Sequence, residues 1–372
     1  MKYPIGIQDF EDLQRNGYAY VDKTNFVYKL ADEGKYYFLS RPRRFGKSLF
    51  LSTLEAYFQG KKELFKGLAI YDLETEWKKY PIFHIDLNTA NFREKDSLYT
   101  VLNDYLTTWE SKYGTRESEA TLALRFKGVI ARAAEKEGCG VVILIDEYDK
   151  PILQTLRDPE LQAEHRAQLK AFYSVLKTQD RYIKFAFLTG VTKFGKVSVF
   201  SDLNNLTDIS MDHRYISICG MTEKELLTNF KEGISELAEA NGDSETETIA
   251  KISMRYAGYH FEENSEEIYN PFSVLNTLAN SRYDDYWFKA NTHTFLIDIL
   301  KKHDYCITQI KANMMNNVET NPIPVIYQSG YLTIKSYDER FKNYQLGFPN
   351  KEVEEGILNI FPPISKRRKT DC

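Results

Sequence analysis

Gly46, Lys47 and Ser48 stand together between a short apolar run at 36–39 and apolar residues at helical spacing over 51–58. This strand-loop-helix order is the context in which backbone N–H groups at a helix N-terminus bind phosphate. Glycine lets the chain approach an anion without a Cβ. We therefore predict a phosphate-binding loop in which Lys47 reaches the β- and γ-phosphates and Ser48 offers its hydroxyl to Mg²⁺. We expect the Lys47 ammonium to be exposed and to contact only phosphates.

The loop departs from the usual phosphate-loop pattern at one position. The pattern has a glycine six residues before the lysine, and this chain has Arg41 there. A Gly-Lys-Ser triplet also occurs by chance, so an ordinary strand-to-helix turn is the alternative interpretation of this segment.

A second signal is the stretch GVVILIDEYDKP at 140–151. Its apolar, β-branched run at 141–145 is typical of a strand buried on both faces of a parallel sheet, and the run ends in Asp146 and Glu147. Ligands of doubly wound sheets bind at the carboxyl ends of strands. We expect Asp146 to support Mg²⁺ and Glu147 to polarise a water as general base. Solvated acids after an ordinary strand are the alternative, which the upstream Gly-Lys-Ser makes weak.

Further strands and helices are predicted around these two strands. The strands are at 81–87, 183–190 and 214–219, and the helices are at 98–111, 119–136 and 161–177. Alternating strands and helices indicate an α/β P-loop NTPase with a mostly parallel five-stranded core sheet covered on both faces. A strand between the loop and the acidic strand, and a glutamate directly after the aspartate, fit the additional-strand ATPase division.

Thr189 ends the fourth predicted strand, at the same sheet edge as Asp146. Its hydroxyl is a candidate to orient water or to sense the γ-phosphate, and a threonine that simply ends a strand is the alternative. The polar segment 193–210, with Asn204 and Asn205 in its middle, is predicted to be a long functional or mobile loop.

The second half of the chain has a different character. Thr222 and Glu225 predict a capping box for a helix that continues to about residue 240, and Asn270 with Pro271 predicts another helix start. Residues 329–349 alternate as two strands around a charged turn before a helix. The expected domains are the P-loop domain at 1–220, a helical lid at 221–300, a winged-helix-like unit at 301–362 and a basic disordered tail at 363–372.

Composition limits the class of protein. Hydrophobic residues make up 42%, and the net charge of -4 with a pI near 6.0 argues against a surface that generally coats nucleic acid. The 4 cysteines lack pair spacing, so neither a zinc site nor disulfides are expected. With no signal-peptide pattern at the start and no apolar run near the ~20 residues of a membrane span, we expect a cytoplasmic protein without a membrane partner.

Several ordered motifs together resemble the bacterial AAA-ATPase-like family. They are IGIQDFEDL, YVDKT, FLSRPRRFGKSLFLSTL, LIDEYDKPI, FLTGVTKF, FSDLNNLTDIS, YNPFSVLN, QSGYLTIK and YQLGFPNKEV, and they cover about residues 3 to 358. The family's own loop has the form R-P-R-R-F-G-K-S, which accounts for Arg41. Pro42 lacks an N–H but stands at the start of the loop, which leaves the N–H groups of 43–48 for phosphate.

The resemblance implies ATP and Mg²⁺ as ligands. The expected nucleotide-binding residues are Arg43, Arg44, Phe45, Gly46, Lys47, Ser48 and Leu49; the metal ligands are Ser48 and Asp146; the catalytic residues are Glu147, Lys47 and Thr189. For Arg43 and Arg44, phosphate binding and surface pairing with acids both stay open. The segments GIQDF and YVDKT either flank the adenine or pack against the sheet.

The function expected from these residues is ATP hydrolysis with Mg²⁺. The alternative is a nucleotide-gated switch or scaffold that binds ATP, hydrolyses it little and engages a protein or nucleic-acid partner. A second copy of the chain stays open as a partner. A GTPase is disfavoured because the sequence has no N-K-x-D motif.

Members of the family usually continue into a PD-(D/E)XK nuclease-like domain. After residue 330 no aspartate is followed at suitable distance by E-x-K, so this chain looks truncated or frameshifted relative to the family.

We therefore expect no nuclease activity from this chain, because the acidic and lysine constellation that metal-dependent phosphodiester cleavage requires is missing. The measurement is incubation with plasmid DNA and Mg²⁺ or Mn²⁺. Metal-dependent cutting that survives repurification would contradict the expectation.

Overall fold

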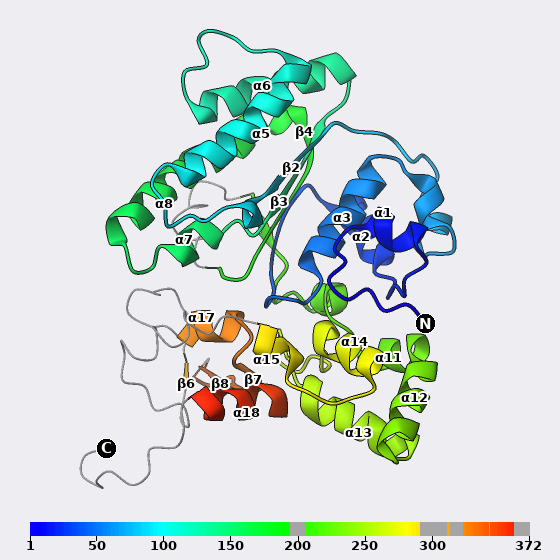
Figure 1. Cartoon of the computed structure of the whole chain (residues 1–372). Helices are drawn as coiled ribbons and strands as arrows, with labels where there is room; N and C mark the ends of the chain where they lie inside the picture. The colour runs from blue at the N-terminus through cyan, green and yellow to red at the C-terminus, as the bar shows by residue number, and fades with distance from the viewer. Residues whose placement is uncertain (194–204, 291–310, 313–322, 342, 361–372) are drawn as a thin grey trace, which may run out of the picture. The chain divides into compact units, whose positions relative to one another are not determined.

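The computed structural model describes residues 1–193, 205–290, 311–312, 323–341 and 343–360 (Figure 1). The chain divides into two compact units. The core unit comprises residues 6–219, and the C-terminal unit comprises residues 220–372 together with residues 1–5.

The core unit contains a five-stranded parallel sheet in the order β2-β3-β4-β1-β5. Its strands are β1 (Tyr36–Ser40), β2 (Ile82–Asp86), β3 (Val141–Asp146), β4 (Ile183–Gly190) and β5 (Thr207–Asp208). Strand β4 lies between β1, which leads into the predicted phosphate loop, and β3, which carries the acids. The sheet confirms the predicted five-stranded α/β core with an additional strand between β1 and β3. That strand is β4, whereas β2, which separates β1 from β3 in the sequence, lies at the edge of the sheet.

The fifth strand is not where it was predicted. Residues His213–Ile218 form the 3-10 segment η4, in which Tyr215, Ile216 and Ile218 are buried. The side chain of Asp212 accepts a hydrogen bond from the Arg214 N–H and so starts the turn. The fifth strand is the short β5, inside the segment predicted as a loop; Asn204 lies outside the described residues, and Asn205 is exposed.

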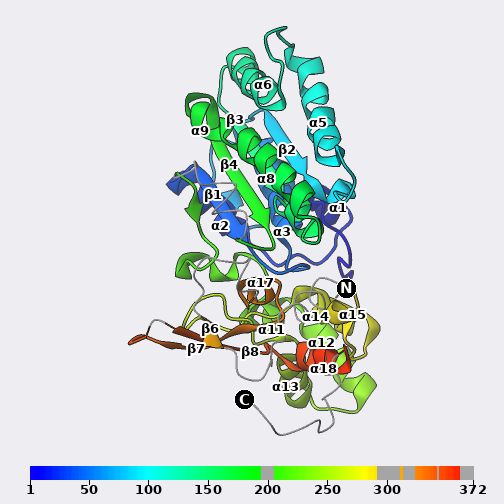
Figure 2. The same ribbon diagram turned by 90° about the vertical axis from the view of Figure 1, so that its left-hand side faces the viewer.

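Helices cover both faces of the sheet (Figures 1 and 2). One face carries α5 (Ser97–Tyr113), α6 (Leu122–Glu137), α7 (Lys150–Gln154) and α8 (Pro159–Tyr173), and the other carries α1 (Phe10–Arg15), α2 (Thr24–Glu33) and α3 (Lys47–Phe58). Successive residues of β1 alternate between the faces. Tyr36 and Phe38 belong to the hydrophobic cluster that includes Phe126, whereas the Tyr37 ring lies 6.4 Å from that of Phe187.

Shorter helical segments complete the core unit. They are η1 (Lys62–Phe65), α4 (Ile70–Leu73), η2 (Leu87–Thr89), α9 (Val175–Thr178) and η3 (Asp180–Tyr182). The three long helices predicted from sequence are present as α5, α6 and α8. Helix α8 ends earlier than predicted, because Ser174 separates it from α9.

The C-terminal unit is mainly helical. Its helices are α11 (Glu223–Asn229), α12 (Lys231–Asn241), α13 (Glu245–Tyr256), α14 (Pro271–Asn280), α15 (Tyr286–Ala290), α17 (Ile323–Gln328) and α18 (Lys351–Ile360). A three-stranded sheet in the order β6-β8-β7 is formed by β6 (Lys311–Ala312), β7 (Thr333–Asp338) and β8 (Asn343–Gly347).

The predicted helix starts of this unit are confirmed. Thr222 and Glu225 form a capping box, and the Asn270 side chain accepts from the N–H groups of the first turn of α14. The helix expected to reach residue 240 is interrupted at Phe230, between α11 and α12. The hairpin predicted within 329–349 is the antiparallel pair β7 and β8. The lid and the winged-helix-like unit stay predictions, and residues 361–372, which include the basic tail, lie outside the described residues.

A buried carboxylate joins three helices of the C-terminal unit. Glu352 of α18 is fully buried, and its Oε1 accepts a hydrogen bond of 2.7 Å from the N–H of Trp287 in α15. Its Oε2 accepts one of 2.8 Å from the Ser273 hydroxyl in α14. Burial raises the pKa of Glu352 to about 7, and these hydrogen bonds oppose the rise.

This pKa predicts a stability that falls with pH. The folded-state pKa lies above the unfolded value of 4.5, so the contribution is fully present below that value and is lost as pH rises through about 7. The shift corresponds to about 3 kcal/mol. Glu352→Gln keeps a neutral side chain at every pH, so its stability relative to wild type should rise between pH 5 and 8.

The measurement is urea unfolding followed by the fluorescence of Trp287, with Trp77 and Trp109 replaced by Phe. The matched control is Glu354→Gln, which changes an exposed residue of the same helix and should follow wild type at every pH. A stability difference between Glu352→Gln and wild type that does not vary with pH would contradict the prediction.

Candidate nucleotide-binding site

The predicted phosphate loop joins β1 to α3. Helix α3 begins at Lys47, directly after Gly46, whose φ of 93° is in the left-handed region that favours glycine. A Cβ built on Gly46 meets nothing within 4 Å, so the space beside the loop is open. Arg44 also has a left-handed φ, of 65°. The loop therefore offers the N-terminal N–H groups of α3 to an anion on an open side.

Arg41 has a role that the sequence did not indicate. The side chain is 1% exposed and turns into the core unit rather than toward the loop. Its guanidinium donates hydrogen bonds of 2.7 Å to the carbonyl of Ser210 and 3.3 Å to each of the carbonyls of Tyr215 and Ile216. Arg41 thereby joins the start of the loop to η4 and to the residues before it.

Lys47 is buried, contrary to the expectation of an exposed ammonium. The residue is 4% exposed, and its Nζ donates to the carbonyls of Arg41 at 3.1 Å and Pro42 at 3.2 Å. The same Nζ lies 3.2 Å from Oε1 of Glu147. These contacts hold the ammonium in place within the protein, so phosphate oxygens would have to replace some of them.

Asp146 brings the predicted metal ligands together. This carboxylate is 4% exposed and accepts hydrogen bonds from the Ser48 hydroxyl through Oδ2 and from the Thr189 hydroxyl through Oδ1, the latter at 2.5 Å. The N–H of Glu147 donates to Oδ1 at 3.0 Å. Thr189 is fully buried, and its hydroxyl donates to the predicted metal ligand Asp146. Its role as a sensor of the γ-phosphate stays a prediction.

Glu147 leaves the sheet with a left-handed backbone. Its φ is 52°, a conformation that costs about 1–2 kcal/mol for a residue with a Cβ. The side chain is 14% exposed and points to Lys47, with which it forms the ion pair. The structure thus brings Glu147, Lys47, Ser48 and Asp146 into one cluster at the carboxyl ends of β1 and β3.

The remaining predicted residues lie along the loop. Arg43 and Arg44 are exposed, which leaves phosphate binding and surface pairing both open. Phe45 is 1% exposed, so only its backbone is available to a nucleotide. Leu49 is partly exposed in the first turn of α3.

Polar residues of β2 also lie near this cluster. Asp86 pairs in register with Asp146, and burial raises the pKa of its carboxyl. Nδ1 of His84 lies 2.7 Å from Oε2 of Glu55 in α3; burial lowers the pKa of His84, but this carboxylate raises it overall. The alternation in PIFHIDL places both strand residues on one face, and it is the sequence signal by which they could have been found.

Two residues after Glu147 were also missed. Asp149 is fully buried, and burial together with the Glu147 carboxylate raises its pKa to about 6. Lys150 donates to Oδ1 of Asn88 at 2.7 Å, and burial lowers the pKa of its ammonium. Their spacing in DEYDKP carried no specific signal.

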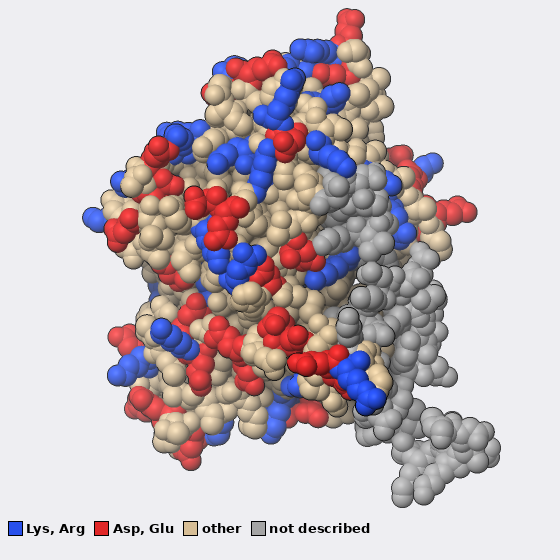
Figure 3. Space-filling view, turned by 180° about the vertical axis from the view of Figure 1, so that it is seen from behind, with Lys and Arg blue, Asp and Glu red and all other residues tan. Residues whose placement is uncertain are grey.

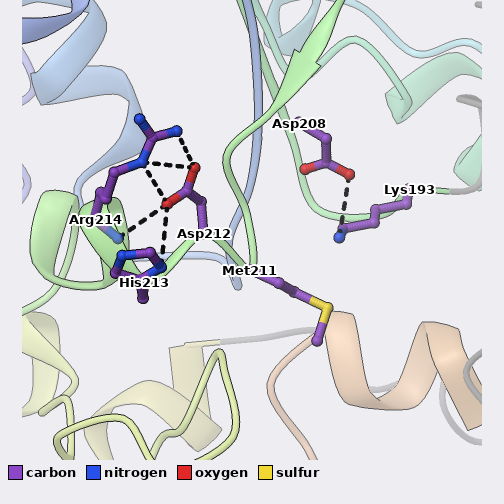
Figure 4. A pocket seen from close by; sticks show the side chains of 6 residues that line it. All are labelled: Lys193, Asp208, Met211, Asp212, His213 and Arg214. Atoms are coloured by element: carbon purple, nitrogen blue, oxygen red, sulfur yellow. Dashed lines mark hydrogen bonds and ion pairs between the residues drawn. The ribbon is translucent and has the colours of Figure 1, made fainter.

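A separate pocket of about 620 Å³ lies beyond the carboxyl ends of β4 and β5 (Figure 4). Its lining is Lys193, Asp208, Met211, Asp212, His213 and Arg214. Lys193 pairs with Asp208 at 3.2 Å, and Arg214 pairs with Asp212 at 2.6 Å. None of the predicted site residues lines this pocket.

The donor set at Ser48 and Asp146 fits Mg²⁺. A hydroxyl and a carboxylate are hard oxygen ligands of the kind that Mg²⁺ prefers, and Mg²⁺ usually completes its shell with water and substrate phosphate. Within the described residues, no group of three or more His, Cys, Asp or Glu side chains could hold a metal by itself. Nor does any helix described here have the length and apolar character needed to cross a membrane.

Comparisons with known proteins show the family to which the chain belongs. The family described as Predicted AAA-ATPase matches residues 4–200. An uncharacterized protein in the vnfD 5' region of Azotobacter chroococcum mcd 1 is 38% identical over 386 residues, covering 99% of this chain and 72% of that protein. A solved structure of the Aeropyrum pernix ORC2 protein, in ADPNP and ADP complexes, matches over 94% of this chain and 92% of its own chain. The sequence identity is 12% and the TM-score is 0.30. This last similarity is too low to bear on fold or function. The chain belongs to the Predicted AAA-ATPase family.

Proposed function

We propose that this protein binds ATP with Mg²⁺ and hydrolyses it. The observation that carries the proposal is the convergence of Lys47, Ser48, Asp146 and Glu147 beside an open loop at the carboxyl ends of two parallel strands. Family membership supports the ATPase class. Phosphoryl transfer requires positioning and charge stabilisation, which this set of groups can supply.

Lys47 and the backbone N–H groups of 43–48 would bind the β- and γ-phosphates. Lys47 would exchange Glu147 and two carbonyls for phosphate oxygens, so its ammonium would remain paired with acceptors throughout. Ser48 and Asp146 would hold Mg²⁺, which when bound neutralises negative charge on the phosphates. Arg43 and Arg44 are exposed at the loop and would be further phosphate contacts.

Glu147 would serve as the general base. Once Lys47 moves to phosphate, the carboxylate of Glu147 is free to accept a proton from water that attacks the γ-phosphate in line. Thr189 donates to Asp146 and thereby fixes the rotation of that carboxylate. The base and the metal ligand are adjacent residues, so their relative positions are set by one peptide unit.

A nucleotide-gated switch with little turnover is the second candidate function. The ion pair of Lys47 with Glu147 favours it, because a carboxylate that is paired with a buried ammonium cannot orient an attacking water until the pair separates. A second copy of the chain or another protein would then be the partner. A nucleic-acid partner has little support: basic and acidic side chains are interspersed on the face of the core unit that Figure 3 shows.

Lys47→Ala should abolish ATP binding. The substitution removes the cation that meets the phosphates, while the left-handed loop residues Arg44 and Gly46 remain. Because Lys47 also bonds two carbonyls, a small loss of stability is expected as well. The measurement is titration with a fluorescent ATP analogue, alongside thermal unfolding. Lys127→Ala, at an exposed position of α6, is the matched control. Unchanged ATP affinity in folded Lys47→Ala would exclude the phosphate-loop assignment.

Glu147→Gln should preserve ATP binding and reduce hydrolysis. Ser48 and Asp146 remain, and loss of a general base lowers turnover by about 10²–10⁴. Loss of the ion pair also frees Lys47, so affinity should stay equal or increase. Affinity by titration and phosphate release at saturating ATP are measured on both proteins. Equal turnover rules out Glu147 as the base, whereas a wild type that binds ATP without turnover supports the switch.

A further inference from the structure

The chain segments that leave β3 and β4 are joined by a fully buried carboxylate. Asp149 follows β3, and its Oδ1 accepts a hydrogen bond of 3.2 Å from the N–H of Val191. Its Oδ2 accepts one of 2.7 Å from the N–H of Thr192 and another of 2.6 Å from the Thr192 hydroxyl. Three donors from one segment therefore converge on one side chain from the other.

Tyr148 adds two more hydrogen bonds between the same segments. Its N–H donates to the carbonyl of Thr189 at 3.0 Å, and its hydroxyl donates to the carbonyl of Thr192 at 2.8 Å. The close approach requires a glycine at residue 190, since a Cβ there would lie 2.5 Å from the ring of Tyr148 and 2.7 Å from Oδ1 of Asp149. The two segments are thus packed closely against each other.

These two packed segments include two residues of the proposed site. Glu147 precedes Tyr148, and Thr189 precedes Gly190. The left-handed backbone of Glu147 is a strained conformation that neighbouring contacts must stabilise. We propose that Asp149 is a positioning residue of the ATPase site, which holds the segment carrying Glu147 against the end of β4 and so fixes the base relative to Thr189 and Asp146. This inference rests on the proposed ATP hydrolysis.

The three hydrogen bonds that Asp149 accepts require a carboxylate at this position. Both oxygens of Asp149 act as acceptors, whereas an asparagine has a single acceptor and would turn its NH₂ group toward a donor. Burying a carboxylate is costly, and the nearby Glu147 carboxylate increases that cost. This buried carboxylate lies where the segment that carries Glu147 meets the segment that carries Thr189.

The test uses Asp149→Asn and Thr192→Val, each alone and combined with Glu147→Gln. Asp149→Asn loses at least one of the three hydrogen bonds, and Thr192→Val loses only the bond of the hydroxyl. ATP affinity should not change, because Lys47 and Ser48 are untouched. Phosphate release at saturating ATP should fall by about 10–100-fold for Asp149→Asn, as expected when a catalytic group is displaced by about 1 Å, and by less for Thr192→Val.

The combined variants separate positioning from general destabilisation. If Asp149 acts through Glu147, adding Asp149→Asn to Glu147→Gln causes no further loss of turnover, because coupled residues are not additive. The matched control is Glu110→Gln, a 7% exposed carboxylate of α5 that binds Arg125. It should lower the unfolding midpoint without changing turnover per folded molecule.

Full turnover in Asp149→Asn, or a loss that multiplies with that of Glu147→Gln, would overturn the inference while wild-type hydrolysis remained. A turnover loss in Glu110→Gln equal to that in Asp149→Asn would also overturn it. If Asp149→Asn does not fold, Thr192→Val and its combination with Glu147→Gln decide by the same criteria. A wild type without hydrolysis rejects the proposed activity, and the positioning role with it.

Discussion

The carboxylate of Asp146 is the contact on which the rest of the site depends. It accepts hydrogen bonds from Ser48 at the start of α3, from Thr189 at the end of β4 and from the backbone of Glu147. Ser48 and Thr189 are far from Asp146 in the sequence. They meet because parallel strands end at the same edge of a sheet and because β4 lies between β1 and β3. The order of the strands therefore determines which side chains can act together.

The buried strands could be predicted from the sequence because burial on both faces requires long apolar runs. The run at 141–145 and the acids after it indicated the positions of β3 and Asp146. Strand β5 could not be found this way: it has two residues, a threonine and an aspartate, and among the described strands it pairs with β1 alone. The segment 214–219 was wrongly predicted as a strand because Tyr215, Ile216 and Ile218 are apolar and buried. Buried residues are apolar in a 3-10 turn as they are in a strand, so residue types alone do not distinguish the two.

The sequence predicted which residues belong to the candidate site, but it did not predict how each of them is buried and paired. Lys47, Ser48, Asp146 and Glu147 were identified, and the structure brings them together. The burial of Lys47 was missed because its partners include the carbonyls of Arg41 and Pro42, and backbone acceptors leave no mark in a sequence. Contacts made by the backbone depend on the path of the chain, which only the folded structure supplies.

Arg41 shows why the phosphate-loop pattern can lack its first glycine. A positive φ favours glycine, and the left-handed residues of this loop are Arg44 and Gly46. Residue 41 instead continues the strand, because its N–H donates to the carbonyl of Gly190 at 3.2 Å. A side chain is therefore allowed at this position, and its guanidinium binds carbonyls of Ser210 and η4. The first glycine of the usual pattern is thus replaced by a residue that fastens the loop to the segment leading out of the core unit.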